Sequence, residues 1–102
     1  MQAEQNLSSN TDNLFMQLAL DQAIKGFVKE EVPIGAVIID ESGKLIAKAF
    51  NTTEKTCQQS SHAEILAINK ACKKLKSWRL TGCTIYVTLE PCLMCYGLIK
   101  LS

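Results

Sequence analysis

The sequence predicts an α/β fold in which helices cover a sheet, and three observations support this prediction. Apolar residues recur at helical spacing near the N-terminus and again after residue 62. Between these two segments, Ile34 to Ile39 and Lys44 to Phe50 have the composition of strands joined by a turn. A third apolar segment, Cys83 to Thr88, follows the second helical pattern. The order helix, hairpin, helix, strand, helix is typical of a sandwich with helices packed on a sheet.

The first predicted helix follows a polar segment. Thr11, Asp12 or Asn13 can cap it, and Gly26 lies near its end. Residues Met1 to Asp12 are rich in Gln, Asn and Ser, so we expect a disordered N-terminal arm over 1–12 and a folded domain over 13–102. The apolar positions of this helix are Leu14, Phe15, Leu18, Ala19, Ala23, Ile24 and Phe27.

The hairpin and the segment after it differ in polarity. Ile34 to Ile39 is almost wholly apolar, which predicts a strand buried on both faces. The turn falls at Asp40 to Gly43. Asn51 to Ser61 is polar and has no periodicity, so we expect a loop there.

The C-terminal part of the sequence predicts a helix from His62 to about Leu75 and a strand at Cys83 to Thr88. Pro91 then begins a last helix, because proline suits a first helical turn. No later segment is left to cover the edge of the strand at Cys83 to Thr88, so we expect an open apolar edge. The sequence is therefore expected to be a domain that is incomplete at its C-terminus. A natural short variant is the alternative.

Composition and charge restrict the class of protein. The chain has 102 residues and a net charge of +1, which neither indicates nor excludes a nucleic-acid partner. No apolar run is long enough to span a membrane. The chain has five cysteines, which is an odd number. Two of them form a C-x-x-C motif, and a histidine lies far from this motif in the sequence. This pattern favours a metal site in a reducing cytoplasm over a disulfide scaffold, and predicts ordinary thiols at Cys57, Cys72 and Cys83.

The residues that carry chemistry are His62, Glu64, Cys92 and Cys95. One imidazole and two thiolates are the ligand set of a catalytic zinc, whose fourth position is left to water. Two cysteines three apart at a helix N-terminus lie on one face, where the helix dipole favours thiolates. Glu64 is then available to move the protons of that water. A structural zinc site and a metal-free coincidence are the alternatives.

These residues resemble the zinc signature of the cytidine/deoxycytidylate deaminase superfamily, a signature known from enzymes that act on nucleobases. Within it the chain is similar to the tRNA-specific adenosine deaminases. Residues 31–37 look like their first strand, and residues 88–97 look like their second zinc motif. Asn51 stands eleven residues before His62, as the family's substrate-binding asparagine does. The resemblance covers about Asn13 to Ser102, which is about two-thirds of a family domain.

The resemblance implies a cytidine-deaminase-like three-layer α/β/α sandwich, incomplete at the C-terminus. It implies one zinc ion per chain, bound by His62, Cys92 and Cys95. Glu64 would be the catalytic residue, taking a proton from the zinc-bound water and passing protons to the base. The residues that would contact the substrate are Asn51, which would bond the flipped adenosine, Ala63 through its backbone, Pro33 and Pro91.

The implied function is the hydrolytic deamination of adenosine to inosine at the wobble position of tRNA. The implied partners are the anticodon loop and a second copy in a homodimer, and the implied location is the cytoplasm. Gln58 to Ser61 depart from the family pattern, so this loop is expected to bind its anticodon differently. The alternatives are a deaminase of a free base or nucleoside, of the guanine or cytosine type, and an inactive zinc-binding fragment.

Overall fold

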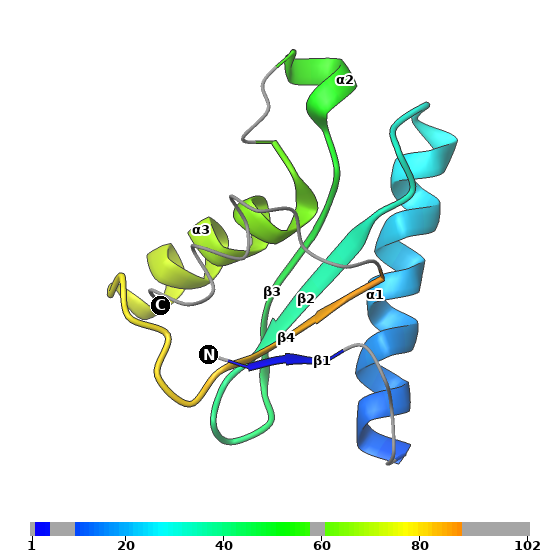
Figure 1. The fold of residues 1–102 in the computed structure, drawn as a ribbon. Helices are drawn as coiled ribbons and strands as arrows, with labels where there is room; N and C mark the ends of the chain where they lie inside the picture. The colour runs from blue at the N-terminus through cyan, green and yellow to red at the C-terminus, as the bar shows by residue number, and fades with distance from the viewer. Residues whose placement is uncertain (1, 5–9, 58–60, 89–102) are drawn as a thin grey trace.

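The computed structural model describes residues 2–4, 10–57 and 61–88 (Figure 1). The helix expected from Pro91 lies outside these residues, as do Cys92 and Cys95. The elements in chain order are β1 (Gln2–Glu4), α1 (Asn10–Val28), β2 (Gly35–Ile39), β3 (Leu45–Phe50), α2 (Thr53–Thr56), α3 (Ala63–Leu75) and β4 (Thr84–Val87).

The four strands form one mixed sheet in the order β1-β4-β2-β3. The predicted hairpin is confirmed, because β2 pairs with β3 in antiparallel register. On its other side β2 pairs antiparallel with β4, where Ala36 is opposite Val87. The turn between β2 and β3 is held by Asp40, whose carboxylate accepts hydrogen bonds from the Ser42 hydroxyl and from the backbone of Ser42 and Lys44.

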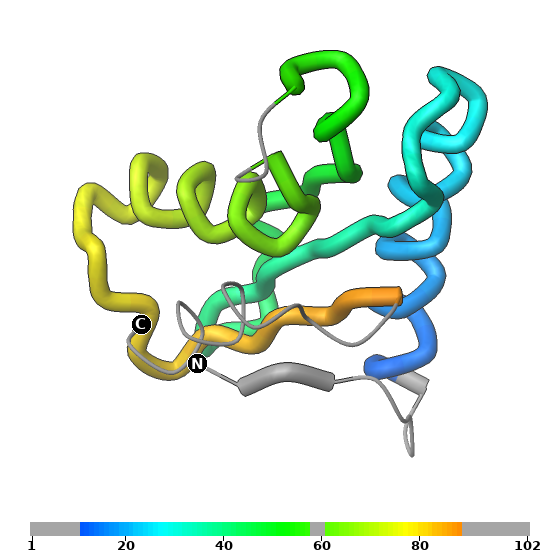
Figure 2. Tube along the Cα trace, turned by 45° about the horizontal axis from the view of Figure 1, so that its top comes forward, coloured from blue at the N-terminus to red at the C-terminus, as the bar shows by residue number. Residues whose placement is uncertain are grey.

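Helices α1 and α3 lie on opposite faces of this sheet, which confirms the three-layer α/β/α arrangement (Figures 1 and 2). All five residues of β2 are buried, as expected for a strand covered on both faces. Val37 and Ile39 belong to the apolar cluster that includes α1, whereas Ala36 and Ile38 belong to the cluster that includes α3. The alternation follows from the two-residue period of a strand.

The close approach of α1 to the sheet depends on Gly35. A Cβ at this position would lie 2.6 Å from the backbone nitrogen of Ala23 and would also collide with the carbonyl oxygen of Ala19. The chain returns from α1 to β2 through Glu30, which has a positive φ of 63°. None of the helices in the described ranges combines the length and the apolar character that crossing a bilayer requires.

The N-terminal segment forms elements that the sequence pattern did not indicate. Gln2–Glu4 form a strand, and α1 begins at Asn10. The edge of β4 is not open, because β1 pairs with it in parallel register from Gln2↔Thr84 to Glu4↔Tyr86. The unpaired N–H and C=O groups of a buried strand need partners, and the N-terminal segment supplies them.

Candidate functional site

The candidate site lies at the end of the sheet where β3 ends and α3 begins. The Asn51 N–H donates to the Ile34 carbonyl at 3.0 Å, which ties the end of β3 to the loop before β2. The Thr52 N–H donates to the Ser61 carbonyl at 2.9 Å. Since Thr52 follows Asn51 and Ser61 precedes His62, this bond brings the two predicted site residues to the same place.

The end of β4 reaches the same region through a reciprocal pair of hydrogen bonds with Gly35. The Thr88 N–H donates to the Gly35 carbonyl at 3.2 Å, and the Gly35 N–H donates to the Thr88 hydroxyl at 3.2 Å. Thr88 is the last residue of this segment that the structure describes. The chain therefore leaves the sheet beside β2, four residues before Cys92 in the sequence.

Asn51 is buried, with 2% of its surface exposed. Its Nδ2 donates to the Thr53 hydroxyl at 2.9 Å. Its Oδ1 is buried and, among the described residues, has no hydrogen-bond partner. A buried acceptor without a partner carries a desolvation cost, so native structures retain few of them. This oxygen is therefore a candidate contact for a ligand.

His62 and Glu64 stand at the start of α3. His62 is the N-cap residue, with extended backbone and no capping hydrogen bond from its side chain, so its imidazole is not used as a cap. Glu64 is in the first turn and is only 3% exposed. The positive end of the helix dipole favours a carboxylate at this position. Ala63, between them, is fully buried.

The donor set fits a catalytic zinc as far as the structure describes it. His62 is a partly buried imidazole, and Glu64, which follows two residues later in the sequence, is a buried carboxylate. Cys92, Cys95 and Pro91 lie outside the described residues. Within the described ranges no group of three His, Cys, Asp or Glu side chains gathers, as expected when two of the three predicted ligands are not among them. Pro33 is exposed and directly precedes Ile34, whose carbonyl accepts the hydrogen bond from the Asn51 N–H.

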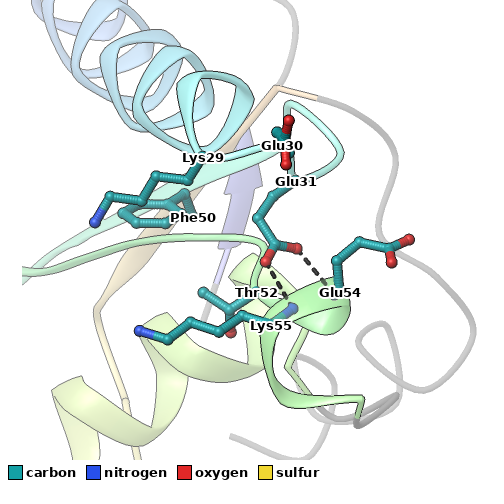
Figure 3. Close-up of a pocket in the computed structure, with 7 residues that line it drawn as sticks. All are labelled: Lys29, Glu30, Glu31, Phe50, Thr52, Glu54 and Lys55. Atoms are coloured by element: carbon teal, nitrogen blue, oxygen red, sulfur yellow. Dashed lines mark hydrogen bonds between the residues drawn. The ribbon is translucent and has the colours of Figure 1, made fainter.

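One cavity is separate from these residues. It has a volume of ≈ 370 Å³ and lies between the end of α1, the end of β3 and α2 (Figure 3). Lys29 lies over the ring of Phe50 at one side of it, 5.3 Å from the ring centroid. The residues that line it are Lys29, Glu30, Glu31, Phe50, Thr52, Glu54 and Lys55, none of which is a predicted site residue.

Basic residues gather at the other end of α3. The helix has 13 residues, so its C-terminal end is about 20 Å from His62. Trp78 is 64% exposed there, and the guanidinium of Arg79 lies 4.7 Å from its ring centroid. Lys70 donates to the Lys48 carbonyl at 2.9 Å. The length of α3 therefore separates these basic residues from the candidate site.

The cysteines in the described ranges have free thiols. Cys57 is exposed, Cys72 is half-buried and Cys83 is buried. Burial raises the pKa of the Cys83 thiol, and the charge of Asp40 acts in the same direction. A buried thiol that resists ionisation is unreactive, which agrees with the ordinary role expected for it.

Sequence analysis missed Glu31 and Thr53. Glu31 is 6% exposed, and its two carboxylate oxygens accept hydrogen bonds from the N–H groups of Glu54 and Lys55, each at 2.9 Å. In the sequence Glu31 is only one of several polar residues that end the first helical pattern, and Thr53 lies in a polar segment without periodicity. The available signal was an acidic residue a few positions before an apolar strand.

The chain belongs to the cytidine and deoxycytidylate deaminase family, because the model of that family's zinc-binding region matches residues 9–102. It is 50% identical over 91 residues to the tRNA-specific adenosine deaminase of Bacillus subtilis, an alignment that covers 89% of this chain. It is 49% identical over 88 residues to the enzyme of the same name from Aquifex aeolicus, covering 86% of this chain. The chain spans 56% and 58% of the lengths of these two relatives.

Solved structures agree with this family. A structure from a study of A-to-I editing by tRNA:A34 deaminases at the wobble position superposes with a TM-score of 0.83 and 44% identity, over 87% of this chain and 68% of that one. A guanine deaminase from Bacillus subtilis superposes with a TM-score of 0.82 and 37% identity, over 86% of this chain and 56% of that one. The fold is thus shared by deaminases named for different substrates.

Proposed function

We propose that the protein containing this chain converts adenosine to inosine by hydrolysis at the wobble position of tRNA. The observation that carries the proposal is the convergence of Asn51, His62 and Glu64 at one end of the sheet, where the buried Asn51 oxygen has no partner among the described residues. Support for the substrate comes from relatives named as tRNA-specific adenosine deaminases, which are 50% and 49% identical to this chain over the 91 and 88 aligned residues.

Each site residue has a role in this proposal. His62, Cys92 and Cys95 would hold one zinc ion per chain, which supplies an acidified water when bound. Glu64 would accept a proton from the attacking water and pass it to the base, and would then carry the second proton of that oxygen to the departing amine, because an unprotonated ring amine is a poor leaving group. Asn51 and the Ala63 backbone hold the base, and Pro33 and Pro91 lie beside it. The deaminase domain would span 13–102.

The partners and location belong to the same proposal. We expect a homodimer that binds the anticodon loop, in a reducing cytoplasm. The odd number of cysteines and the C-x-x-C motif at Cys92 and Cys95 support a reducing compartment.

The test is Glu64→Gln, which removes the charge of a buried carboxylate and keeps its shape. We expect bound zinc to stay close to one ion per chain while inosine formation on an anticodon stem-loop falls by about 10²- to 10⁴-fold. Asp21→Ala, which changes an exposed carboxylate on α1, is the matched control and should keep full activity. Full turnover by Glu64→Gln would exclude the proposed role, and an unsubstituted chain without zinc or turnover would identify an inactive fragment.

A deaminase of free guanine is the second candidate, because the guanine deaminase structure superposes almost as well as the tRNA-related one. The two are separated by competition between the stem-loop and free guanine, cytosine and their nucleosides. Turnover of the stem-loop that none of these small molecules inhibits supports the tRNA substrate, whereas ammonia release from guanine supports the second candidate.

A further inference from the structure

The side-chain amide of Asn51 is held by a neighbour. Its Nδ2 donates to the Thr53 hydroxyl at 2.9 Å, whereas its Oδ1 has no partner in the described part of the chain. Without the bond to Thr53 the Asn51 amide is able to rotate, so that its oxygen or its NH₂ group bonds to a different partner. In this arrangement the Thr53 hydroxyl holds Nδ2 and leaves Oδ1 available to the substrate.

Thr53 is itself held by a short helix that does not form on its own. Helix α2 has four residues, far fewer than an isolated helix needs in water. Its first N–H groups have no partners within the helix, which is the general condition of helix starts. The N-cap residue Thr52 makes no side-chain capping bond. A capping group from elsewhere in the chain is therefore required.

Glu31 is that capping group. Its Oε1 accepts from the Glu54 N–H and its Oε2 accepts from the Lys55 N–H, so both oxygens are bonded to the first turn of α2 (Figure 3). Bonds from an N–H to a carboxylate are stronger than bonds between neutral groups, and they offset the cost of burying the charge.

The position of Glu31 is fixed in turn by the end of α1. Its N–H donates to the Gly26 carbonyl at 2.9 Å, and the preceding residue Glu30 turns the chain with a φ of 63°. A second contact closes the other side of the loop, where the Thr56 hydroxyl donates to the Ser61 hydroxyl next to His62. The loop that carries Asn51 is thus anchored at α1 and at the start of α3.

We propose that Glu31 and Thr53 are positioning residues that orient the Asn51 amide toward the substrate. Glu31 holds the first turn of α2, that turn places the Thr53 hydroxyl, and the hydroxyl holds Nδ2 so that Oδ1 meets a hydrogen-bond donor of the nucleoside. This inference rests on the proposed function for the role of Asn51, although the order of the loop itself does not.

The first test compares pairs of variants in steady-state deamination of an anticodon stem-loop. Thr53→Val and Glu31→Gln should each raise KM relative to kcat and lower kcat/KM by about three- to tenfold, the amount expected for one hydrogen bond. Thr53→Ser keeps the hydroxyl and should stay within about twofold of the unsubstituted protein. Glu30→Gln is the control for loss of a neighbouring exposed charge. Zinc content should not change in any of them.

The double variant Glu31→Gln/Thr53→Val tests whether the two residues act on the same amide. If they do, its loss of kcat/KM is no larger than that of the more damaged single variant. The proposal would be overturned if the two single-variant losses of kcat/KM multiplied in the double variant, or if Thr53→Val left KM and kcat unchanged.

A second readout does not need activity. The side-chain NH₂ signals of Asn51 in a ¹⁵N–¹H spectrum should shift and exchange faster in Thr53→Val and Glu31→Gln, but not in Thr53→Ser or Glu30→Gln. If the unsubstituted protein proves inactive on the stem-loop, the proposed function fails and these spectra alone decide the inference. Unchanged Asn51 signals in both variants would overturn it.

Discussion

Single buried polar side chains in this protein differ in whether their bonding capacity is filled. Both carboxylate oxygens of Glu31 accept hydrogen bonds from backbone N–H groups, and the Ser61 hydroxyl accepts one from the Thr56 hydroxyl. Asn51 has one end of its amide bonded and the other end without a partner among the described residues. The difference separates side chains that stabilise the loop from a side chain that keeps one end available to a ligand.

Cys83 leads to a prediction at the same scale. Burial raises the pKa of its thiol above the unfolded value of about 8.5, so unfolded chains lose the proton first as the pH rises. Its contribution to stability is therefore complete below about pH 8.5 and is lost as the pH rises through the folded-state pKa. We expect the free energy of unfolding, measured with urea under reducing conditions, to fall more steeply from pH 8 to pH 10 in the unsubstituted protein than in Cys83→Ala. Parallel pH profiles would contradict this account.

At the scale of elements, the contact between α1 and β2 is the most sensitive point of the fold. Gly35→Ala would place a methyl group against the backbone of α1, which has no flexible end that is able to move away. We expect it to lower the free energy of unfolding by about 3 kcal/mol or more.

The matched variant for this contact is Gly26→Ala. Its Cβ would meet only the side chain of Phe50, at 3.2 Å, and alanine favours a helix over glycine. We expect a change of less than about 1 kcal/mol for this control. Urea denaturation followed by circular dichroism compares the two, and equal midpoints would show that α1 lies farther from β2 than described.

The elements that the sequence predicted are those whose residues carry a periodic pattern of their own. The predicted bounds agree to within four residues for α1, α3, β2, β3 and β4. This agreement arises because the apolar residues of these elements follow the helical or strand period that builds the core. His62 and Asn51 stay predictions as site residues, and they come from a motif and from a family resemblance rather than from apolar spacing. Helix α2 was not predictable, because it depends on a carboxylate from a distant part of the chain.

At the scale of the whole molecule, β1 was missed for a related reason. Three residues carry no periodic signal, and their conformation depends on pairing with a strand at the other end of the chain. As a result the sequence predicted an open edge on the strand at Cys83 to Thr88, whereas the structure pairs β1 with β4.

This pairing predicts the effect of replacing Gln2–Glu4 with Gly-Ser-Gly. Loss of β1 would leave one edge of β4 unpaired, while the opposite edge keeps its bonds to β2. We expect faster amide hydrogen exchange for those β4 amides that face β1, unchanged exchange for those that face β2, and more self-association on size-exclusion chromatography. Uniform protection along β4 in the variant would contradict a stabilising role for β1.

The parallel pairing of β1 with β4 also sets the order in which the molecule is completed during its synthesis. Residue 2 is synthesised well before its partner, residue 84. At ordinary translation rates the first strand waits on the order of ten seconds for its neighbour to be made. Helix α1 and the β2–β3 hairpin have time to form before then, because their contacts are local. Strand β1 is therefore made early but stays unpaired until β4 has been synthesised.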